Sequence, residues 1–185
     1  MTPPPAQTPT SSLTHQQHLA ALANIKAFSL KGRLGVVTNL RGFSGGIEWQ
    51  HQAANDNIDI FSPVGGKVAN ITRNPSGLTL TSQDGHTIKA SDTESLTEAT
   101  LGWRLPLKDL SDWAIGRPSA SKIEDSSWDT QGRLLTLKQD GWDISYENYT
   151  EHNSTFLPSK IVLKSEKVNL KLLVEKWLSD DNLPH

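Results

Sequence analysis

The chain has 185 residues, which is enough for one domain with a sizeable core but short for two. Eighteen Lys and Arg residues against 20 Asp and Glu residues give a formal charge of -2, which argues against nucleic-acid binding because that function normally needs a basic surface. The absence of cysteine excludes disulfides, thiolate metal sites and a cysteine nucleophile, and neither a spanning apolar run of roughly 18 residues nor a signal-peptide pattern occurs.

The first residues predict a tether followed by a helix. Residues 1–12 are mostly Pro, Thr, Ser and Gln, a composition that buries too little apolar surface to offset the entropy of ordering. Thr14 and Gln17 have the spacing of a capping box, and Leu19 and Leu22 follow at helical intervals. We therefore expect a flexible segment over 1–12 and a first helix from Thr14 to about Asn24.

A period of two then predicts a series of strands. Apolar and polar residues alternate between Phe28 and Val37, and the alternation resumes over 42–49. Glycines interrupt both segments and predict bends or bulges. Further short strands, separated by turn residues, are centred on Ile58, Val68, Leu78 and Ile88. This spacing predicts an antiparallel meander.

The middle of the chain predicts helices, after which strands return. Ser91 and Glu94 begin one helical pattern that runs to Trp103, and Pro106 begins another that ends near Gly116. Asp140-Gly141 is a strong hairpin signal between the strands around Leu137 and Ile144. Two final strands are predicted around 161–163 and 168–174.

These elements predict a mainly β (α+β) fold with about nine to eleven antiparallel strands in a single domain over 13–179, followed by a tail over 180–185. One face of such a sheet must be buried, and a curled sheet wrapped on helices does this. The concave side can be a filled core or can hold an apolar ligand cavity. The candidate lining residues are Phe28, Leu30, Ile47, Trp49, Ile58, Ile60, Leu78, Leu80, Leu101, Trp103, Leu110, Trp113, Leu135, Leu137, Trp142, Ile144 and Tyr146.

The segment Ser62-Pro63-Val64-Gly65-Gly66 places an apolar side chain where hairpin loops normally carry polar ones. A protein that touches a membrane or another apolar surface has a use for such a residue. We predict a membrane-contacting loop at Pro63, Val64 and Gly65. In the alternative, Val64 folds back onto its own sheet.

The residues give little support for catalysis or for a metal or other cofactor. His15 and His18 lie three residues apart on the first predicted helix without a third ligand, so we expect solvated polar side chains. Asp109 and Asp112 share one helix, whereas paired catalytic carboxylates usually come from separate elements. The sequence at Lys67 lacks the spacing of a phosphate-binding loop. We expect no enzymatic activity.

Several segments, taken in order, resemble the LolB family of outer-membrane lipoprotein receptors in Gram-negative bacteria. The resemblance runs from about Phe28 to Trp177. The matching segments are Phe28-Ser29-Leu30-Lys31-Gly32-Arg33-Leu34, Gly46-Ile47-Glu48-Trp49, Ser62-Pro63-Val64-Gly65, Leu101-Gly102-Trp103-Arg104-Leu105-Pro106-Leu107, Gln139-Asp140-Gly141-Trp142, Leu157-Pro158-Ser159-Lys160-Ile161 and Glu175-Lys176-Trp177.

The resemblance implies an unclosed half-barrel whose helices cover an apolar cavity on the concave face. It implies a monomer that accepts lipoprotein acyl chains from the periplasmic carrier LolA and inserts them into outer-membrane phospholipid without nucleotide hydrolysis. The family's members carry an N-terminal lipidated Cys, so we expect that Met1 replaces a signal and a lipid anchor that were removed. With its anchor, the protein is expected on the periplasmic face of the outer membrane. The usual loop residue is Leu, where this chain has Val64.

Two alternatives remain at this point. A soluble LolA-type carrier would lack the apolar loop and the tether. A generic lipid-binding barrel or an enzyme would hold a small hydrophobic molecule in the same cavity.

Overall fold

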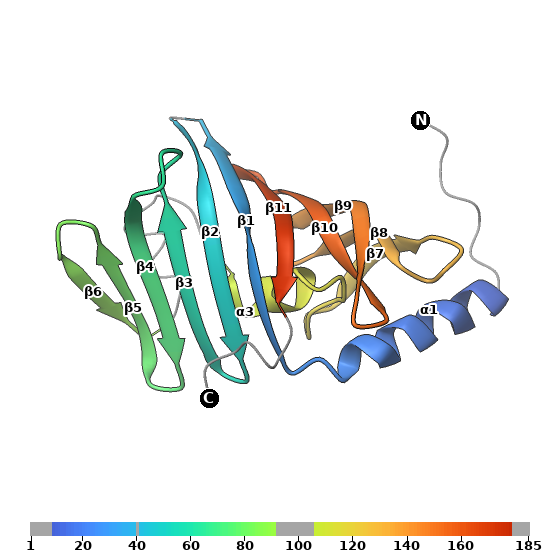
Figure 1. The fold of residues 1–185 in the computed structure, drawn as a ribbon. Coiled ribbons are helices and arrows are strands. Elements are labelled where there is room, and N and C mark those ends of the chain that lie inside the picture. The colour runs from blue at the N-terminus through green and yellow to red at the C-terminus, as the bar shows by residue number, and fades with distance from the viewer. Residues whose placement is uncertain (1–8, 40, 92–105, 179–185) are drawn as a thin grey trace.

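A computed structural model of the chain describes residues 9–39, 41–91 and 106–178. Its main feature is an 11-stranded antiparallel sheet with the strand order β6-β5-β4-β3-β2-β1-β11-β10-β9-β8-β7 (Figure 1). The strands are β1 (Ala27–Thr38), β2 (Gly42–Gln52), β3 (Asn55–Phe61), β4 (Lys67–Asn74), β5 (Gly77–Ser82), β6 (Thr87–Ala90), β7 (Ile123–Trp128), β8 (Leu134–Gln139), β9 (Trp142–His152), β10 (Thr155–Lys164) and β11 (Val168–Leu178). The predicted mainly β, antiparallel class is confirmed.

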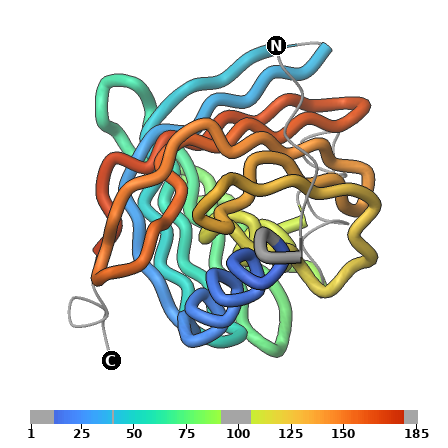
Figure 2. Tube along the Cα trace, turned by 90° about the vertical axis from the view of Figure 1, so that its right-hand side faces the viewer, coloured from blue at the N-terminus to red at the C-terminus, as the bar shows by residue number. Residues whose placement is uncertain are grey.

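The sheet curls without closing, because β6 and β7 remain as its two edges. Helix α3 (Leu107–Trp113) lies inside the curl (Figures 1 and 2). Helix α1 (Pro9–Ala23) lies beside the turn between β7 and β8, where His15 stacks on Trp128 with ring centroids 4.1 Å apart. The fold is therefore a half-barrel with a helix in its concave side.

The first and last strands pair at the centre of the sheet. In this β1–β11 pair, Leu30 lies opposite Trp177 and Val36 opposite Leu170. The pair joins the meander β1–β6 to the meander β7–β11. Both halves therefore contribute to one continuous concave surface.

Glycines allow β1 and β2 to approach their neighbours closely, and the bulge that the glycines predicted occurs at Gly32. The β1–β11 register shifts between Lys31 and Gly32, and a Cβ atom at Gly32 would overlap the carbonyl oxygen of Leu173. A Cβ atom at Gly45 would likewise overlap the carbonyl oxygen of Phe61. These two positions exclude any larger residue unless the strands separate.

Several sequence-based predictions need correction. Helix α1 begins at Pro9, not at Thr14, so part of the predicted tether is helical and the predicted capping box lies inside the helix. Proline is compatible with a first helical turn because the amide hydrogen that it lacks has no partner there. Strand β7 was not predicted, because its sequence Ile123-Glu-Asp-Ser-Ser-Trp128 has no apolar alternation. The helix predicted from Ser91 to Trp103 lies outside the described residues, apart from Ser91.

Candidate functional site

The loop between β3 and β4 projects Val64 into solvent. The side chain of Val64 is 95% exposed. The amide of Ser62 donates to the carbonyl of Gly66 at 2.7 Å, and the amide of Gly65 donates to the carbonyl of Ser62 at 2.9 Å. Gly65 has a φ of +101°, which most side chains disfavour. This compact turn holds Val64 outward, and the alternative that Val64 folds back onto its sheet is wrong.

The loop lies at one end of the sheet, at the tip of the β3–β4 hairpin (Figure 1). Pro63 stands before the tip and Gly65 after it, so the chain reverses within five residues, from Ser62 to Gly66. The hydroxyl oxygen of Ser62 also accepts a hydrogen bond from the amide of Gly66 at 3.2 Å. The three predicted loop residues therefore form one tight, outward-pointing unit.

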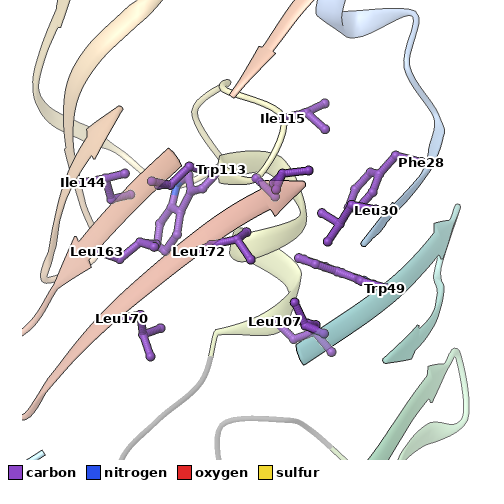
Figure 3. Close-up of a cluster of buried hydrophobic side chains, with 14 of the residues drawn as sticks. Phe28, Leu30, Trp49, Leu107, Trp113, Ile115, Ile144, Leu163, Leu170 and Leu172 are labelled. Atoms are coloured by element: carbon purple, nitrogen blue, oxygen red, sulfur yellow. The ribbon is translucent and has the colours of Figure 1, made fainter. Parts of the chain in front are cut away.

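Most of the predicted cavity residues belong to one hydrophobic cluster on the concave face. Figure 3 shows Leu30 and Trp49 of this cluster beside α3. Eleven of the predicted residues are buried, namely Phe28, Leu30, Ile47, Trp49, Ile58, Leu78, Trp113, Leu137, Trp142, Ile144 and Tyr146. Three more, Ile60, Leu80 and Leu110, are half-buried against this cluster. Leu101 and Trp103 lie outside the described residues.

Leu135 is the exception among the predicted residues of β8. It is half-buried, whereas its neighbour Leu134 is fully buried in the core. The β7–β8 register shifts between Ser127 and Trp128, opposite this part of β8, which changes the face that each residue occupies. Simple alternation from Leu137 therefore predicts the wrong leucine.

Sequence reasoning also missed several residues that complete the cluster. These are Leu107 and Ile115 around α3, and Leu163, Leu170 and Leu172 on the last two strands (Figure 3). The signal was present, since all three strand residues belong to period-two segments. They were predicted as strand residues but not assigned to the concave lining.

Within the described residues, the concave cluster is packed around α3, and the two pockets that we identify lie elsewhere. One pocket of about 310 Å³ lies at the foot of the β3–β4 loop. The other, of about 510 Å³, is lined by residues of β9, β10 and β11 such as Asn148, Ser159 and Val174. Opening of a cavity on the concave side by displacement of α3 stays a prediction.

Buried polar contacts hold α3 in place. The indole nitrogen of Trp113 donates to the side-chain oxygen of Gln139 at 2.9 Å, and the hydroxyl of Tyr146 donates to the carbonyl of Trp113 at 2.8 Å. Gln139 is fully buried, and burial raises the pKa of Tyr146 well above its ordinary value. These contacts anchor the C-terminal end of α3 to β8 and β9.

An arginine connects α3 to α1. The Nε of Arg117 donates to Asp112 Oδ1 at 2.8 Å, and its Nη1 donates to the carbonyl of Leu22 at 2.7 Å. Leu22 is itself fully buried. Displacement of α3 would therefore disturb the end of α1 as well.

A second buried polar cluster lies in β2, β3 and β4 around Asp56, whose side chain is fully buried. Its Oδ1 accepts from the indole of Trp49 at 2.8 Å and lies 2.7 Å from Nδ1 of His51, and its Oδ2 accepts from Nε of Arg73 at 2.6 Å. Burial alone would raise the pKa of Asp56, but the hydrogen bonds from His51 and Trp49, with the charge of His51, hold it below its ordinary value. This cluster fixes one wall of the concave core.

The expected solvated helix side chains are more buried than predicted. His15 is only 8% exposed, and its Nδ1 lies 2.7 Å from the carbonyl oxygen of Gly132. Burial lowers the pKa of His18, and the nearby His15 lowers it further. Both histidines thus face the β7–β8 turn, and the prediction that they are solvated is wrong.

Among residues 9–39, 41–91 and 106–178 we find no group of three or more His, Cys, Asp or Glu side chains arranged to hold a metal. In the same part of the chain, no helix has the length and apolar character needed to cross a bilayer.

Comparison with known proteins agrees with this arrangement. The family model described as outer membrane lipoprotein LolB matches residues 26–177. An outer-membrane lipoprotein LolB from Nitrosomonas europaea is 36% identical over 163 residues, which cover 87% of this chain and 76% of the relative. The LolB of Thiobacillus denitrificans is 34% identical over 153 residues, which cover 83% of this chain and 81% of the relative.

A solved structure shares the fold at much lower sequence identity. The crystal structure of a LolA superfamily protein from Nitrosomonas europaea has a TM-score of 0.59 and 11% identity, and the alignment covers 96% of each chain. The family match extends from the residue before β1 to Trp177 in β11, so it includes every described strand. The chain therefore belongs to the family of the outer membrane lipoprotein LolB.

Proposed function

We propose that this protein is an outer-membrane receptor that accepts lipoproteins from LolA and inserts them into the outer-membrane phospholipid. The observation that carries the proposal is the combination of an outward-pointing Val64 with a large apolar concave face. The family membership supports the same role. In this proposal, the protein works as a monomer on the periplasmic side of the membrane, and the residues before α1 tether it to a lipid anchor.

Shielding of acyl chains is the physical task of the concave face. Each acyl methylene left in water costs about 0.8 kcal/mol, so a multiply acylated protein needs a partner that covers its chains. The concave aromatic and aliphatic side chains supply such a cover once α3 moves aside. Transfer without nucleotide then requires only that affinity increases from carrier to receptor to bilayer.

Val64 supplies the contact with the bilayer. Complete burial of a valine side chain contributes about 1.5–3 kcal/mol, which suits a brief contact better than permanent anchoring. Because the side chain is already exposed, insertion breaks no packing within the protein. The loop can therefore enter and leave lipid at little cost to the fold.

The test separates uptake from delivery. We expect Val64→Glu to accept a lipoprotein from LolA as the unmodified protein does but to deliver it poorly to liposomes, since the charge must be desolvated there. Val64→Leu should deliver at least as well, gaining up to about 0.8 kcal/mol from one methylene. Ile123→Glu, at an exposed position on edge strand β7, is the matched control and should leave both steps unchanged.

Two measurements decide the proposal, namely lipoprotein transfer from LolA to each variant and transfer from each variant to liposomes. Equal delivery by Val64→Glu and the unmodified protein would refute a membrane role for the loop. Failure of the unmodified protein to take lipoprotein from LolA would refute the receptor role.

A further inference from the structure

The pocket of about 310 Å³ at the foot of the β3–β4 loop lies outside the concave site. Ser62, Pro63 and Gly65 form its wall on the loop side. Residues of β1, β2, β3 and β11 form the rest, including four charged side chains. The pocket therefore adjoins the residue that, in the proposed function, enters the membrane.

A missing side chain creates the hollow. Arg33, Gly46 and Phe61 lie opposite one another on β1, β2 and β3. A Cβ atom at Gly46 would meet the Cβ of Phe61 at 3.4 Å, so the empty position of Gly46 lies on the same face as the phenyl ring. The middle strand thus leaves a gap between a guanidinium group and an aromatic ring.

The charges around the gap are balanced and exposed. Lys31 Nζ lies 3.8 Å from Glu48 Oε1, and Arg33 Nε donates to Glu175 Oε1 at 3.2 Å. Ion pairs between such exposed side chains contribute little to stability, so a ligand carrying both charges can replace them. Two cations and two anions favour a zwitterion over a simple anion.

The pocket lies within a few residues of Val64. Phe61 precedes Val64 by three residues, so the two are separated by less than the length of about 10 Å that an extended chain would span, because the chain turns at Ser62. The headgroup region on each side of a bilayer is about 5–8 Å thick. With Val64 at the hydrocarbon boundary, the pocket lies among the headgroups.

We propose that this pocket binds the headgroup of a zwitterionic phospholipid. Its phosphate lies against Lys31 and Arg33, and its cationic group lies against Glu48 and Glu175. A volume of about 310 Å³ is at the lower end of the range for small-ligand sites, which suits a headgroup. This inference rests on the proposed function, in which the loop meets the membrane.

A glycine pair supplies the test. Gly46→Val fills the hollow, and its Cβ meets only ordinary contacts. Gly35→Val adds the same side chain on β1, where a Cβ would meet only the Cβ of Lys171 at 3.8 Å, and Gly35 does not line the pocket. We expect Gly46→Val to bind vesicles of pure phosphatidylcholine at least about tenfold more weakly, with no change for Gly35→Val.

A second measurement uses the headgroup alone. Glycerophosphocholine added to the unmodified protein should shift the NMR amide signals of Gly46 and Ser62, whereas inorganic phosphate should not. Arg33→Gln should reduce these shifts, and it keeps the proposal testable where Gly46→Val does not fold. Shifts caused equally by inorganic phosphate would identify a simple anion site and overturn the proposal.

The outcomes separate this proposal from the function on which it rests. Unchanged vesicle binding by both Gly46→Val and Arg33→Gln, with delivery still lost in Val64→Glu, overturns the headgroup site alone. Vesicle binding that requires anionic lipid overturns the preference for a zwitterion. Normal delivery by Val64→Glu refutes the membrane role of the loop itself.

Discussion

The carboxylate of Asp56 is the clearest case of one residue that stabilises the core electrostatically. It is fully buried and has three partners, of which Arg73 is cationic. Removal of one member of a buried charge pair costs more than the pair contributes, because the other charge remains without compensation. Removal of the Asp56 carboxylate should therefore lower the stability of the protein strongly, by an amount that depends on pH.

We expect Asp56→Asn to lower the free energy of unfolding by about 3 kcal/mol near neutral pH. The pKa of Asp56 is lower in the folded state than in the unfolded state. The contribution of its carboxylate to stability is therefore complete above the unfolded pKa of 3.8 and is lost as the pH falls through the folded pKa. The difference between the two proteins should therefore shrink below about pH 4. Urea unfolding at several pH values measures this.

Asp143→Asn is the matched control, since this carboxylate is exposed and lies 3.6 Å from Lys138. Its effect should stay within about 0.5 kcal/mol. If Asp56→Asn loses equally little free energy of unfolding, or if its loss does not vary with pH, the buried carboxylate of Asp56 does not stabilise the core in this way.

At the scale of elements, we expect the attachment of α3 to control access to the concave face. Tyr146 and Tyr149 each donate a hydrogen bond from a buried or half-buried hydroxyl to a backbone carbonyl. Only Tyr146 bonds to α3, at Trp113, while Tyr149 bonds to Leu134 of β8. The two tyrosines thus make the same kind of hydrogen bond, but only the bond of Tyr146 holds α3 in place.

Tyr146→Phe and Tyr149→Phe should each destabilise the protein by about 1–2 kcal/mol, through one lost hydrogen bond and one unpaired carbonyl. Only Tyr146→Phe should speed the uptake of a fluorescent acyl chain, because it loosens α3. Stopped-flow fluorescence measures the rate. Equal acceleration in both variants, or in neither, would show that α3 is not the gate.

The elements themselves were largely predictable. Period-two patterns located the strands of the first meander, and Asp140-Gly141 marked a two-residue hairpin in which both residues have positive φ. The alternation of apolar residues did not predict β7. This strand carries few apolar residues and forms because its backbone pairs with β8. The bulge in β8, where Leu135 is the extra residue opposite Ser127 and Trp128 of β7, also has no local signal, which is why Leu135 was assigned to the wrong face.

The candidate site was predictable in part, for the same reasons. Val64 stands out because an apolar residue at a turn is unusual, and its exposure confirms that part of the interpretation. The pocket at Gly46 was not predictable, since it depends on which residues of β1 and β3 lie opposite that glycine. Asp56 and its partners likewise come from three strands whose register the sequence does not specify.

At the scale of the whole molecule, the β1–β11 pair holds the two meanders together. Gly32 lies at the register shift of this pair, against the backbone of Leu173. A side chain there forces the central strands apart, whereas Gly35, three residues along the same strand, has space for a Cβ.

We expect Gly32→Ala to lower the thermal midpoint strongly, by an amount equivalent to about 3 kcal/mol or more, as for overpacked cores. Gly35→Ala should be neutral or stabilising, since alanine restricts the unfolded chain more than glycine does. Thermal unfolding followed by circular dichroism compares the two. Similar midpoints would show that the central pair tolerates separation.

The central β1–β11 pair also sets the order of events when the chain folds. The ion pair between Arg33 and Glu175 joins residues 142 positions apart. Along the strand pair the separation runs from 130 positions at Thr38–Val168 to 149 at Ser29–Leu178. Contacts of this range are slow to form, because the loop that they close is almost the entire domain. One edge of β1 has no partner until the last strand has been synthesised, so the sheet cannot be completed, and its two meanders cannot be joined, before the final residues of the domain are available.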